Sequence, residues 1–206
     1  MKTESYNIHN LCSFKLINSF RIGGFLTDKN FEYQYFRVDD VYNPDFVINI
    51  DKFSPDIKGA ISIYDRCFVK DNYLFAKDVS GKCRWELQIK DFDNPGTSKM
   101  IDLYAIFSGL RKLFRYTALK NIFVRSLLTL PLISRNSALI HASAVSFDRK
   151  AFLFVGKPGV FKTSILMEFI RNYSAEYLGE ENTIIKDGAA YPFPLNIKSF
   201  EYKLKY

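Results

Sequence analysis

The sequence predicts a mixed fold, α+β or α/β, in three parts: a mostly antiparallel β-rich region over residues 1–97, a connector of basic helices over 98–136, and an α/β core over 137–206. Three observations support this prediction. Short β-prone runs separated by turn-forming residues fill the first part. Apolar residues recur at helical spacing in the second. In the third, an apolar run ends at a glycine-containing turn that opens a helical segment.

The composition is that of an ordinary globular protein. Of the 206 residues, 48% are hydrophobic and 17% are aromatic, which is enough for a sizeable core and favours a tightly packed, β-rich interior. The net charge of +7 comes mainly from residues 101–136, where six basic residues accompany one acidic residue. Such a patch could face nucleic acid or an anionic surface. A solvated helix face explains it more simply, so we expect no nucleic-acid partner.

Neither the cysteines nor the N-terminus points to a secreted or membrane protein. Cys12, Cys67 and Cys83 are odd in number and widely spaced, which predicts neither a zinc site nor a disulfide framework. The first ten residues lack the apolar core of a signal peptide, and the longest apolar stretch, around Ser126 to Ile133, is too short to cross a bilayer. We expect a cytoplasmic protein without a transmembrane segment.

The β-prone runs of the first region alternate with turns at intervals that predict hairpins in an antiparallel sheet. The carboxylates among them lie mostly at turns, where Asp side chains bond to the backbone, and we assign them no chemistry. The predicted strands are Phe31 to Val38, Phe46 to Ile50, Ala60 to Tyr64, Cys67 to Lys70, Tyr73 to Ala76 and Cys83 to Lys90.

The pattern changes after Asp93 to Ser98, a cluster of turn formers that predicts a domain boundary. A strand-like start at Ile101 gives way to helical spacing, which continues through a second predicted helix between Leu119 and Arg135. We expect these helices to pack against the sheet that follows. Their apolar positions are Leu110, Leu113, Phe114, Ile122, Val124, Leu127, Leu128 and Leu130, with Lys120 and Arg125 on the other side.

Two apolar runs, Ala138 to Val145 and Ala151 to Val155, are separated by a polar turn and predict neighbouring strands. His141 lies in the middle of the first run, 15 residues before Gly156. A single His in a strand is usually a core residue. Its place beside the strand that leads into the loop makes it a candidate for the site.

The loop that follows has the residue types of a phosphate-binding loop. Gly156 and Gly159 permit a tight turn whose N–H groups point inward, and the helix that opens near Lys162 adds the positive end of its dipole. Lys162 would neutralise the β- and γ-phosphates of a nucleotide, and the Thr163 hydroxyl would bind the accompanying Mg²⁺. The expected nucleotide contacts are Gly156, Lys157, Pro158, Gly159, Val160, Phe161, Lys162, Thr163 and Ser164.

One position departs from the Walker A pattern Gly-x-x-x-x-Gly-Lys-[Ser/Thr], because Phe161 stands where the second glycine belongs. Its ring either points away from the nucleotide or narrows the loop until phosphate no longer fits. The alternative interpretation is an ordinary strand-to-helix turn that contains Gly and Lys by accident. The apolar strand before the loop and the helix after it, with Ile165, Leu166, Phe169 and Ile170 on one face, favour phosphate binding.

An acidic pair, Glu180 and Glu181, ends the next short apolar strand, where a bend at Gly179 could bring both side chains to the phosphates. Phosphoryl transfer uses one carboxylate to hold Mg²⁺ and often a second to accept a proton from the attacking oxygen. The alternative is a solvated surface turn. A hairpin is expected next, with Thr183 to Ile185 and Ala189 to Phe193 as its strands.

Taken together, the segments His141 to Val145, Phe152 to Ser164 and Leu178 to Glu181 resemble the catalytic core of the HPr kinase/phosphorylase family. Val124 to Leu128 and Leu139 to Ser143 resemble motifs of its relatives encoded with peptide-modification systems. The resemblance implies a P-loop core of the phosphoenolpyruvate-carboxykinase type that transfers phosphate from ATP to a serine-type hydroxyl, with Mg²⁺.

By that resemblance, Lys162 and Thr163 hold phosphate and metal, and His141 assists near the phosphates. Glu180 is the candidate base and Glu181 the candidate metal ligand, in an order that the resemblance leaves open. The chain differs from the family at Phe161, and in having Glu-Glu where two aspartates are usual.

The chain ends 25 residues beyond Glu181, where the family continues, so we expect a partial core: a fragment, a core completed by a partner such as a second copy, or one that no longer catalyses. Three functions stay open: a nucleotide-dependent kinase with a protein or peptide acceptor, a non-catalytic nucleotide-binding or regulatory module, and an interaction surface formed by the β region and basic helices.

Overall fold

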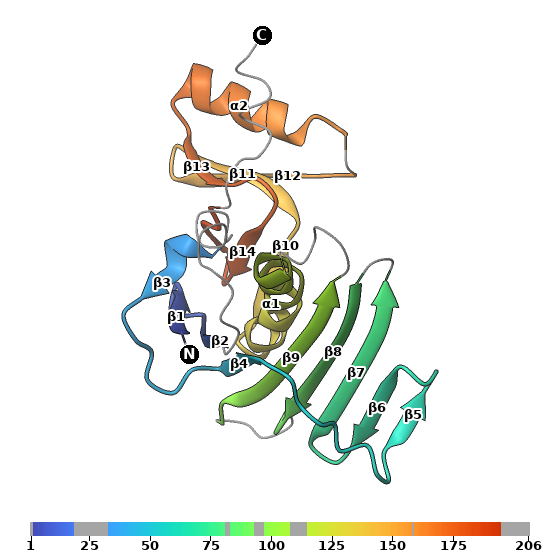
Figure 1. The fold of residues 1–206 in the computed structure, drawn as a ribbon. Helices are drawn as coiled ribbons and strands as arrows, with labels where there is room; N and C mark the ends of the chain where they lie inside the picture. The colour runs from blue at the N-terminus through green and yellow to red at the C-terminus, as the bar shows by residue number, and fades with distance from the viewer. Residues whose placement is uncertain are drawn as a thin grey trace. The chain divides into compact units, whose positions relative to one another are not determined.

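The computed structural model describes residues 2–18, 33–80, 83–92, 97–107, 115–157 and 159–194, and the chain divides into two compact units, Met1–Ser126 and Leu127–Tyr206. Within these ranges more residues lie in strands than in helices, and the α-helices are α1 (Arg115–Ser134) and α2 (Lys162–Tyr173) (Figure 1). The predicted mixture of strands and helices is therefore confirmed. No helix in the described ranges is both long enough and apolar enough to cross a membrane.

One sheet contains all described strands of the first unit. They are β1 (Lys2–Ile8), β2 (Cys12–Asn18), β3 (Arg37–Val38), β4 (Phe46–Ile50), β5 (Ile61–Ile63), β6 (Cys67–Lys70), β7 (Tyr73–Ser80), β8 (Cys83–Lys90) and β9 (Lys99–Phe107). Their order is β3-β1-β2-β4-β9-β8-β7-β6-β5, and the half from β9 to β5 is clear in Figure 1. The predicted strands at β4, β6 and β8 have the expected bounds.

The sheet is mostly antiparallel, as predicted, and β4 is the exception because it runs parallel to both β2 and β9. Parallel neighbours need long connections, and the chain supplies them before and after β4. Strand β4 buries every second residue, so Phe46, Ile48 and Ile50 face the core. Hairpin reasoning from the sequence could not predict this insertion, since it considers only consecutive strands.

Aromatic rings stack across the strands of this core. The rings of Tyr6 and Phe14 lie 4.6 Å apart on β1 and β2, and those of Phe14 and Phe46 lie 5.1 Å apart on β2 and β4. All three side chains are almost fully buried. Cross-strand aromatic pairs of this kind stabilise a sheet beyond the area that they bury. The high aromatic content thus has a structural role in the first unit.

The aromatic run predicted as a strand from Phe31 to Val38 is, in its described part, a strand only at its end. Residues 31 and 32 lie outside the described ranges, Gln34–Phe36 form a 3-10 helix, and only β3 is extended. Tyr33 and Phe36 are both buried. A 3-10 turn aligns residues three apart on one side, whereas a strand would place them on opposite faces. Burial of both rings therefore decided the local conformation.

The predicted domain boundary joins two neighbouring strands instead. Residues 93–96 lie outside the described ranges, but β8 and β9 on either side pair antiparallel from Cys83↔Phe107 to Lys90↔Met100. The start of the expected helical connector is thus strand β9, in which Ile101, Leu103 and Ala105 are buried by strict alternation. The two units divide at residues 126 and 127, inside α1.

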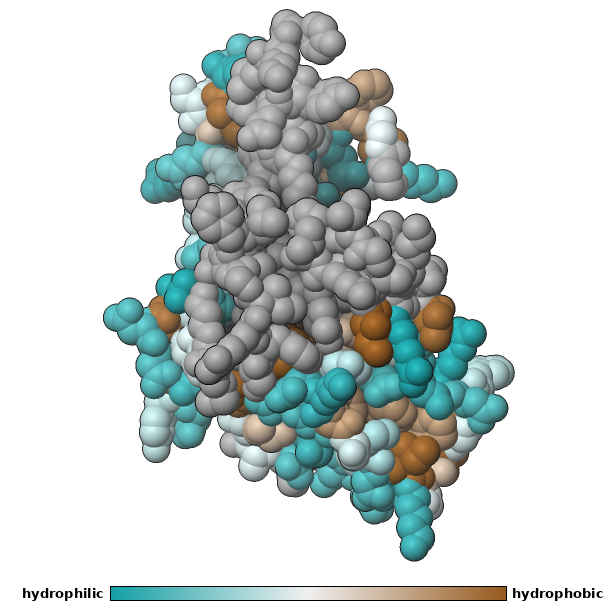
Figure 2. Space-filling model, viewed as in Figure 1, coloured by the Kyte–Doolittle hydropathy of each residue, from teal (hydrophilic) through white to brown (hydrophobic). Residues whose placement is uncertain are grey.

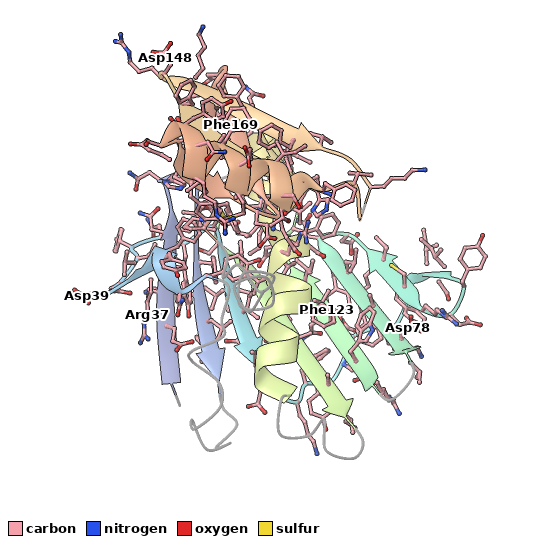
Figure 3. The ribbon with its side chains drawn as sticks, turned by 90° about the horizontal axis from the view of Figure 1, so that it is seen from above. Arg37, Asp39, Asp78, Phe123, Asp148 and Phe169 are labelled. Atoms are coloured by element: carbon pink, nitrogen blue, oxygen red, sulfur yellow. The ribbon has the colours of Figure 1, made fainter. Side chains whose placement is uncertain are left out.

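Helix α1 corresponds to the predicted helix from Leu119 to Arg135, although it begins earlier. Its Phe123 ring, labelled in Figure 3, meets the Trp85 ring of β8 at 5.2 Å. Of the predicted apolar positions, Val124, Leu127 and Leu128 are buried, whereas Leu130 is exposed. Leu110, Leu113 and Phe114, and the side chains of Lys120 and Ile122, lie outside what the structure describes.

The second unit has two small antiparallel sheets in its described part. Their strands are β10 (Ser137–Ile140), β11 (Ala142–Phe147), β12 (Lys150–Val155), β13 (Glu176–Gly179), β14 (Thr183–Lys186) and β15 (Ala189–Tyr191). One sheet has the order β10-β14-β15 and the other β12-β11-β13. The predicted strand from Ala138 to Val145 is therefore two strands, because the chain leaves the first sheet at His141 and enters the second.

A polar network links the middle strands of the first unit. Asp102 accepts hydrogen bonds from Asn49 Nδ2 at 2.9 Å and Gln88 Nε2 at 2.6 Å, and Lys90 Nζ lies 3.2 Å from its carboxylate. The Tyr73 hydroxyl donates to Gln88 Oε1 at 2.7 Å. Burial alone would raise the pKa of Asp102, but the contacts with Asn49, Gln88 and Lys90 outweigh it and hold that pKa below its usual value.

We expect Asp102→Asn to destabilise the protein by about 1–2 kcal/mol at pH 7, because it weakens charge-assisted hydrogen bonds in a half-buried site. The folded pKa is lowered, so the ionised carboxylate contributes fully above its unfolded pKa of about 4 and loses its contribution as pH falls through the folded value. Urea unfolding at pH 7 and pH 3 should show the difference between the proteins shrinking in acid.

Asp78→Asn is the control, since Asp78 contacts Arg66 at 3.3 Å in a more exposed pair on the same sheet. It should change the free energy of unfolding by less than about 0.5 kcal/mol. A destabilisation by Asp102→Asn that does not shrink at pH 3 would contradict the assigned role of the charge.

Candidate functional site

The predicted strand, loop and helix are present in the second unit. Strand β12 ends at Val155, the loop covers residues 156–161, and α2 begins at Lys162. A Cβ on Gly156 would lie 2.7 Å from Val160 Cγ2, so the turn leaves little room for a side chain there. Gly159 has a φ of +86°, a left-handed conformation that favours glycine. Pro158 lies outside the described residues.

The side chain of Lys162 folds back over the loop. Its Nζ donates hydrogen bonds to the carbonyl oxygens of Gly156 at 2.8 Å and Lys157 at 3.1 Å. The ammonium group is therefore held inside the turn and is not extended into solvent. Carbonyl oxygens carry only partial charge, so an anion entering the loop would be a stronger partner for the same ammonium.

Phe161 does not fill the loop. It is the N-cap residue of α2, with φ 60° and ψ 22°, and its side chain is 74% exposed. Of the two alternatives stated for this ring, the structure shows the one in which it points away. The left-handed conformation explains why glycine suits this position, since any L side chain adopts it at a cost of about 1–2 kcal/mol.

Thr163 and Glu180 are joined across the site. The Thr163 hydroxyl, in the first turn of α2, donates to Glu180 Oε1 at 2.8 Å, and Glu180 follows directly on β13. The backbone of Glu180 is fixed in turn, because the hydroxyl of the buried Ser143 on β11 donates to its carbonyl oxygen at 2.8 Å. Three segments distant in sequence thus meet at one residue, with Thr163 on the carboxylate of Glu180 and Ser143 on its backbone carbonyl.

Gly179 makes the bend before Glu180 possible. A Cβ at this position would lie 2.3 Å from the carbonyl oxygen of Asn182 and 3.2 Å from that of Phe193. The backbone N–H of Phe193 also bonds to the Leu178 carbonyl at 2.8 Å, which holds the later segment against β13. The backbone therefore approaches this glycine too closely for any side chain.

The other two candidate site residues, His141 and Glu181, are more exposed than Glu180. The pairing of β11 and β12 ends at Ala142↔Val155, so His141 and Gly156 are the next residues of the two chain segments, and His141 is exposed. Glu181 is also exposed, whereas Glu180 is partly buried. After Gly179 the side chain of Glu180 bonds to Thr163, whereas that of Glu181 is exposed.

The helix is seated on the β12-β11-β13 sheet by a small hydrophobic cluster. Leu166, Val145 and Ala175 are buried at its centre, and the Phe169 ring, labelled in Figure 3, lies 5.4 Å from that of Phe154. Ile165, predicted on this face, is 41% exposed instead. This packing holds the first turn of α2, and with it Lys162 and Thr163, against the sheet.

The arrangement has the chemical groups that an anion and an oxygen-preferring cation would contact. The helix N-terminus, the loop N–H groups and Lys162 supply positive potential. Thr163 and Glu180 supply hydroxyl and carboxylate oxygens, which Mg²⁺ prefers, and Mg²⁺ commonly uses only one or two protein ligands. No group of three or more His, Cys, Asp or Glu side chains that could hold a metal ion occurs among the described residues.

Sequence reasoning missed Ser143, which fixes the backbone of Glu180. The available signal was a polar residue in the middle of a small, apolar strand, since buried hydroxyls need a partner. Comparison of the chain with protein-family models, curated proteins and solved structures found no match.

We expect Phe161→Gly to raise the free energy of unfolding by about 0.5–1 kcal/mol, because glycine relieves the left-handed strain and the exposed ring contributes little burial. Thermal unfolding would measure the change. Phe161→Ala is the control, since it removes the ring and keeps the strain, and it should leave stability nearly unchanged. Equal destabilisation by both substitutions would show that the ring itself packs.

Gly179→Ala should destabilise the second unit by about 1–3 kcal/mol, because backbone atoms must move to admit the methyl group. Gly188→Ala is the matched control: its φ is +75° but no atom lies within 4 Å of the added Cβ. It carries only the left-handed strain, about 1 kcal/mol. Denaturant unfolding should rank Gly179→Ala as the more damaging; the reverse order would contradict the tight bend.

Proposed function

We propose that the second unit binds ATP with Mg²⁺ and transfers the γ-phosphoryl group to a serine-type hydroxyl. The observation that carries the proposal is the pairing of two features in one loop: Lys162 folded over the turn, and Thr163 bonded to Glu180. The order of His141, the loop and the acidic pair, which resembles that of HPr kinase/phosphorylase, supports the same proposal.

Phosphate binding follows from the loop. Lys162 would exchange its contacts with carbonyl oxygens for contacts with the β- and γ-phosphate oxygens. The N–H groups at the start of α2 would add hydrogen bonds that carry no side-chain requirement. For this reason Phe161 is compatible with phosphate binding: its backbone N–H belongs to the loop and its ring lies outside it.

The hydrogen bond between Thr163 and Glu180 favours Glu180 over Glu181 as the residue that holds the metal, because both oxygens already lie 2.8 Å apart. When bound, Mg²⁺ would neutralise charge on the β- and γ-phosphates. This leaves Glu181 as the candidate proton acceptor, in the reverse of the order first suggested by the resemblance. His141, which precedes the Ala142↔Val155 pair at the end of β12, would stabilise charge near the phosphates.

In the proposed reaction the acceptor hydroxyl oxygen forms a bond to the γ-phosphorus while the bond from that phosphorus to the β–γ bridging oxygen breaks. The hydroxyl proton passes to the carboxylate of Glu181, and ADP leaves with the electron pair of the broken bond. Lys162 stabilises the charge that develops on the leaving oxygens.

A second candidate is nucleotide binding without transfer. It is favoured by the exposure of Glu181 and His141, because an exposed proton acceptor is less firmly oriented than a buried one. Both candidates require the same loop and the same Thr163–Glu180 pair. They differ only in whether a hydroxyl acceptor reaches the γ-phosphate.

We expect ATP with Mg²⁺ to raise the melting temperature of the protein, and Lys162→Ala to abolish the rise. A ligand present at one hundred times its dissociation constant adds about 2.7 kcal/mol to stability. Arg171→Ala is the matched control, because it removes an exposed positive charge from the last turn of the same helix and should keep the full shift. No shift in the wild-type protein at millimolar ATP would reject the proposal.

Glu180→Gln should distinguish the contribution of Mg²⁺ to the melting shift from the contribution of the phosphates. The amide keeps the size of the side chain but loses the charge that Mg²⁺ needs, so the melting shift with ATP should no longer depend on Mg²⁺. Glu181→Gln should keep that dependence. Release of ADP in the presence of a hydroxyl acceptor then distinguishes the kinase from the non-catalytic module, and loss of Mg²⁺ dependence in Glu181→Gln alone would reverse the assignment of the two glutamates.

A further inference from the structure

We infer that the outer edge of β12 is the docking site of the acceptor, which binds as an extended acidic peptide adding a strand beside the loop. The inference rests on the proposed function, because it names the class of substrate for the same site. It is carried by three observations: the unpaired edge of β12, the exposed apolar residues around the loop, and the positive charge along both.

Strand β12 is the last strand of its sheet. It pairs with β11 on one side, and no strand in the described part of the chain pairs with the other. The hairpin between β11 and β12 has a two-residue turn, Asp148-Arg149, with φ angles of 49° and 56°. Such a turn makes the flanking residues, Phe147 and Lys150, a hydrogen-bonded pair.

Hydrogen-bonded pairs alternate along an antiparallel ladder, so the other bonded residues of β12 are Phe152 and Phe154. The residues between them direct their N–H and C=O groups away from β11. These residues are Ala151, Leu153 and Val155. The edge thus offers three donors and three acceptors in a row that ends at the loop, which is the arrangement that strand addition requires.

Exposed apolar side chains follow the end of this edge in the loop and in the first turn of α2. Val155 is 68% exposed, Val160 48%, Phe161 74% and Ile165 41%. Figure 2 shows hydrophobic residues at the surface among hydrophilic ones in the region where Figure 1 draws β12 and α2. We call these four residues the loop patch. A partner that docks on the edge and continues past Val155 would cover it.

The charge of the segment selects the partner. Between Phe147 and Lys162 the basic residues are Arg149, Lys150, Lys157 and Lys162, and the acidic residue is Asp148, labelled at the hairpin in Figure 3. Arg149, Lys150 and Lys157 are exposed. An extended peptide that alternates acidic and apolar residues would place carboxylates near these cations and apolar side chains on the loop patch.

The same charges disfavour a second copy as the occupant. Antiparallel pairing of two β12 strands about Leu153 would bring Lys150 of one copy close to Lys157 of the other, at both ends of the pair. Like charges in this position are destabilising, and edge lysines commonly prevent such self-association. The same cations would attract an acidic peptide, whereas they would repel the cations of a second copy.

Docking on this edge explains how a hydroxyl reaches the γ-phosphate. The edge ends at Val155, and the loop that holds Lys162 begins at the next residue. A hydroxyl residue carried at the end of the added strand would therefore enter the site beside the phosphates. Binding energy from the rest of the peptide would hold it there, which is how remote contacts contribute to catalysis.

The test uses a fluorescent eight-residue peptide, Glu-Val-Glu-Val-Glu-Val-Ser-Val, and the whole protein without nucleotide, with binding followed by anisotropy. Two further forms carry methyl groups on backbone nitrogens. One form is methylated at the Glu and Ser positions, and the other at the Val positions. In strand addition only one set of peptide N–H groups faces β12. One form should lose at least about tenfold in affinity and the other should bind as the parent does. Equal binding by both forms would overturn the inference.

The charge requirement is tested on both partners. A peptide with Lys in place of Glu should bind at least about tenfold more weakly. Lys150→Glu should lower the affinity of the protein for the acidic peptide by about fivefold. Lys186→Glu is the matched control, because it makes the same change on β14, in the other sheet, and should leave affinity unchanged. Equal affinity for the two peptides would overturn the inference, as would a dimer of the protein that dissociates when Val155 is replaced by Glu.

The outcome is separable from that of the proposed function. Lys162→Ala should lose the melting shift with ATP and should still distinguish the two N-methylated forms of the peptide, because the edge that adds the strand ends at Val155. A wild-type protein that responds to ATP but does not bind the peptide keeps its proposed nucleotide site and loses this docking edge. Phosphate transfer to the serine of the parent peptide, and not to the form N-methylated on the sensitive set, would support both.

Discussion

The candidate site depends on one hydrogen bond, that between Thr163 at the start of α2 and Glu180 after β13. It exists because the backbone turns at Gly179, where other backbone atoms leave no room for a Cβ, and because the buried Ser143 holds the Glu180 carbonyl. The helix is held in place separately, by Leu166 and the aromatic contacts of Phe169. A carboxylate and a hydroxyl are thereby held together beside the loop that we propose binds phosphate.

The strained backbone of Phe161 is not offset by packing of its side chain. Its backbone is left-handed and its ring is largely exposed, so neither conformation nor burial explains a large side chain there. Strained residues of this kind cluster at binding sites. On the proposed docking edge, the ring belongs to a surface that a peptide covers, and the strain is then offset only in the complex.

The first unit is stabilised differently. Aromatic rings stack across β1, β2 and β4, and a polar network centred on Asp102 crosses β4, β9, β8 and β7. The network is satisfied by its own members, with Lys90 and Gln88 on the carboxylate and Tyr73 on Gln88. These contacts account for the lowered pKa of Asp102, and no catalytic role is needed to explain it.

Features that depend on neighbouring residues could be predicted from the sequence. Alternation and turn formers predicted β4, β6 and β8 with their bounds, and the glycines and Lys162 predicted the strand, loop and helix of the site, because these signals are local. Tertiary structure decided which distant segments meet. Only it could insert β4 parallel between β2 and β9, divide the strand at His141 between two sheets, and choose Glu180 over Glu181 as the partner of Thr163. Each choice was made by packing between residues far apart in the chain, which no periodicity records.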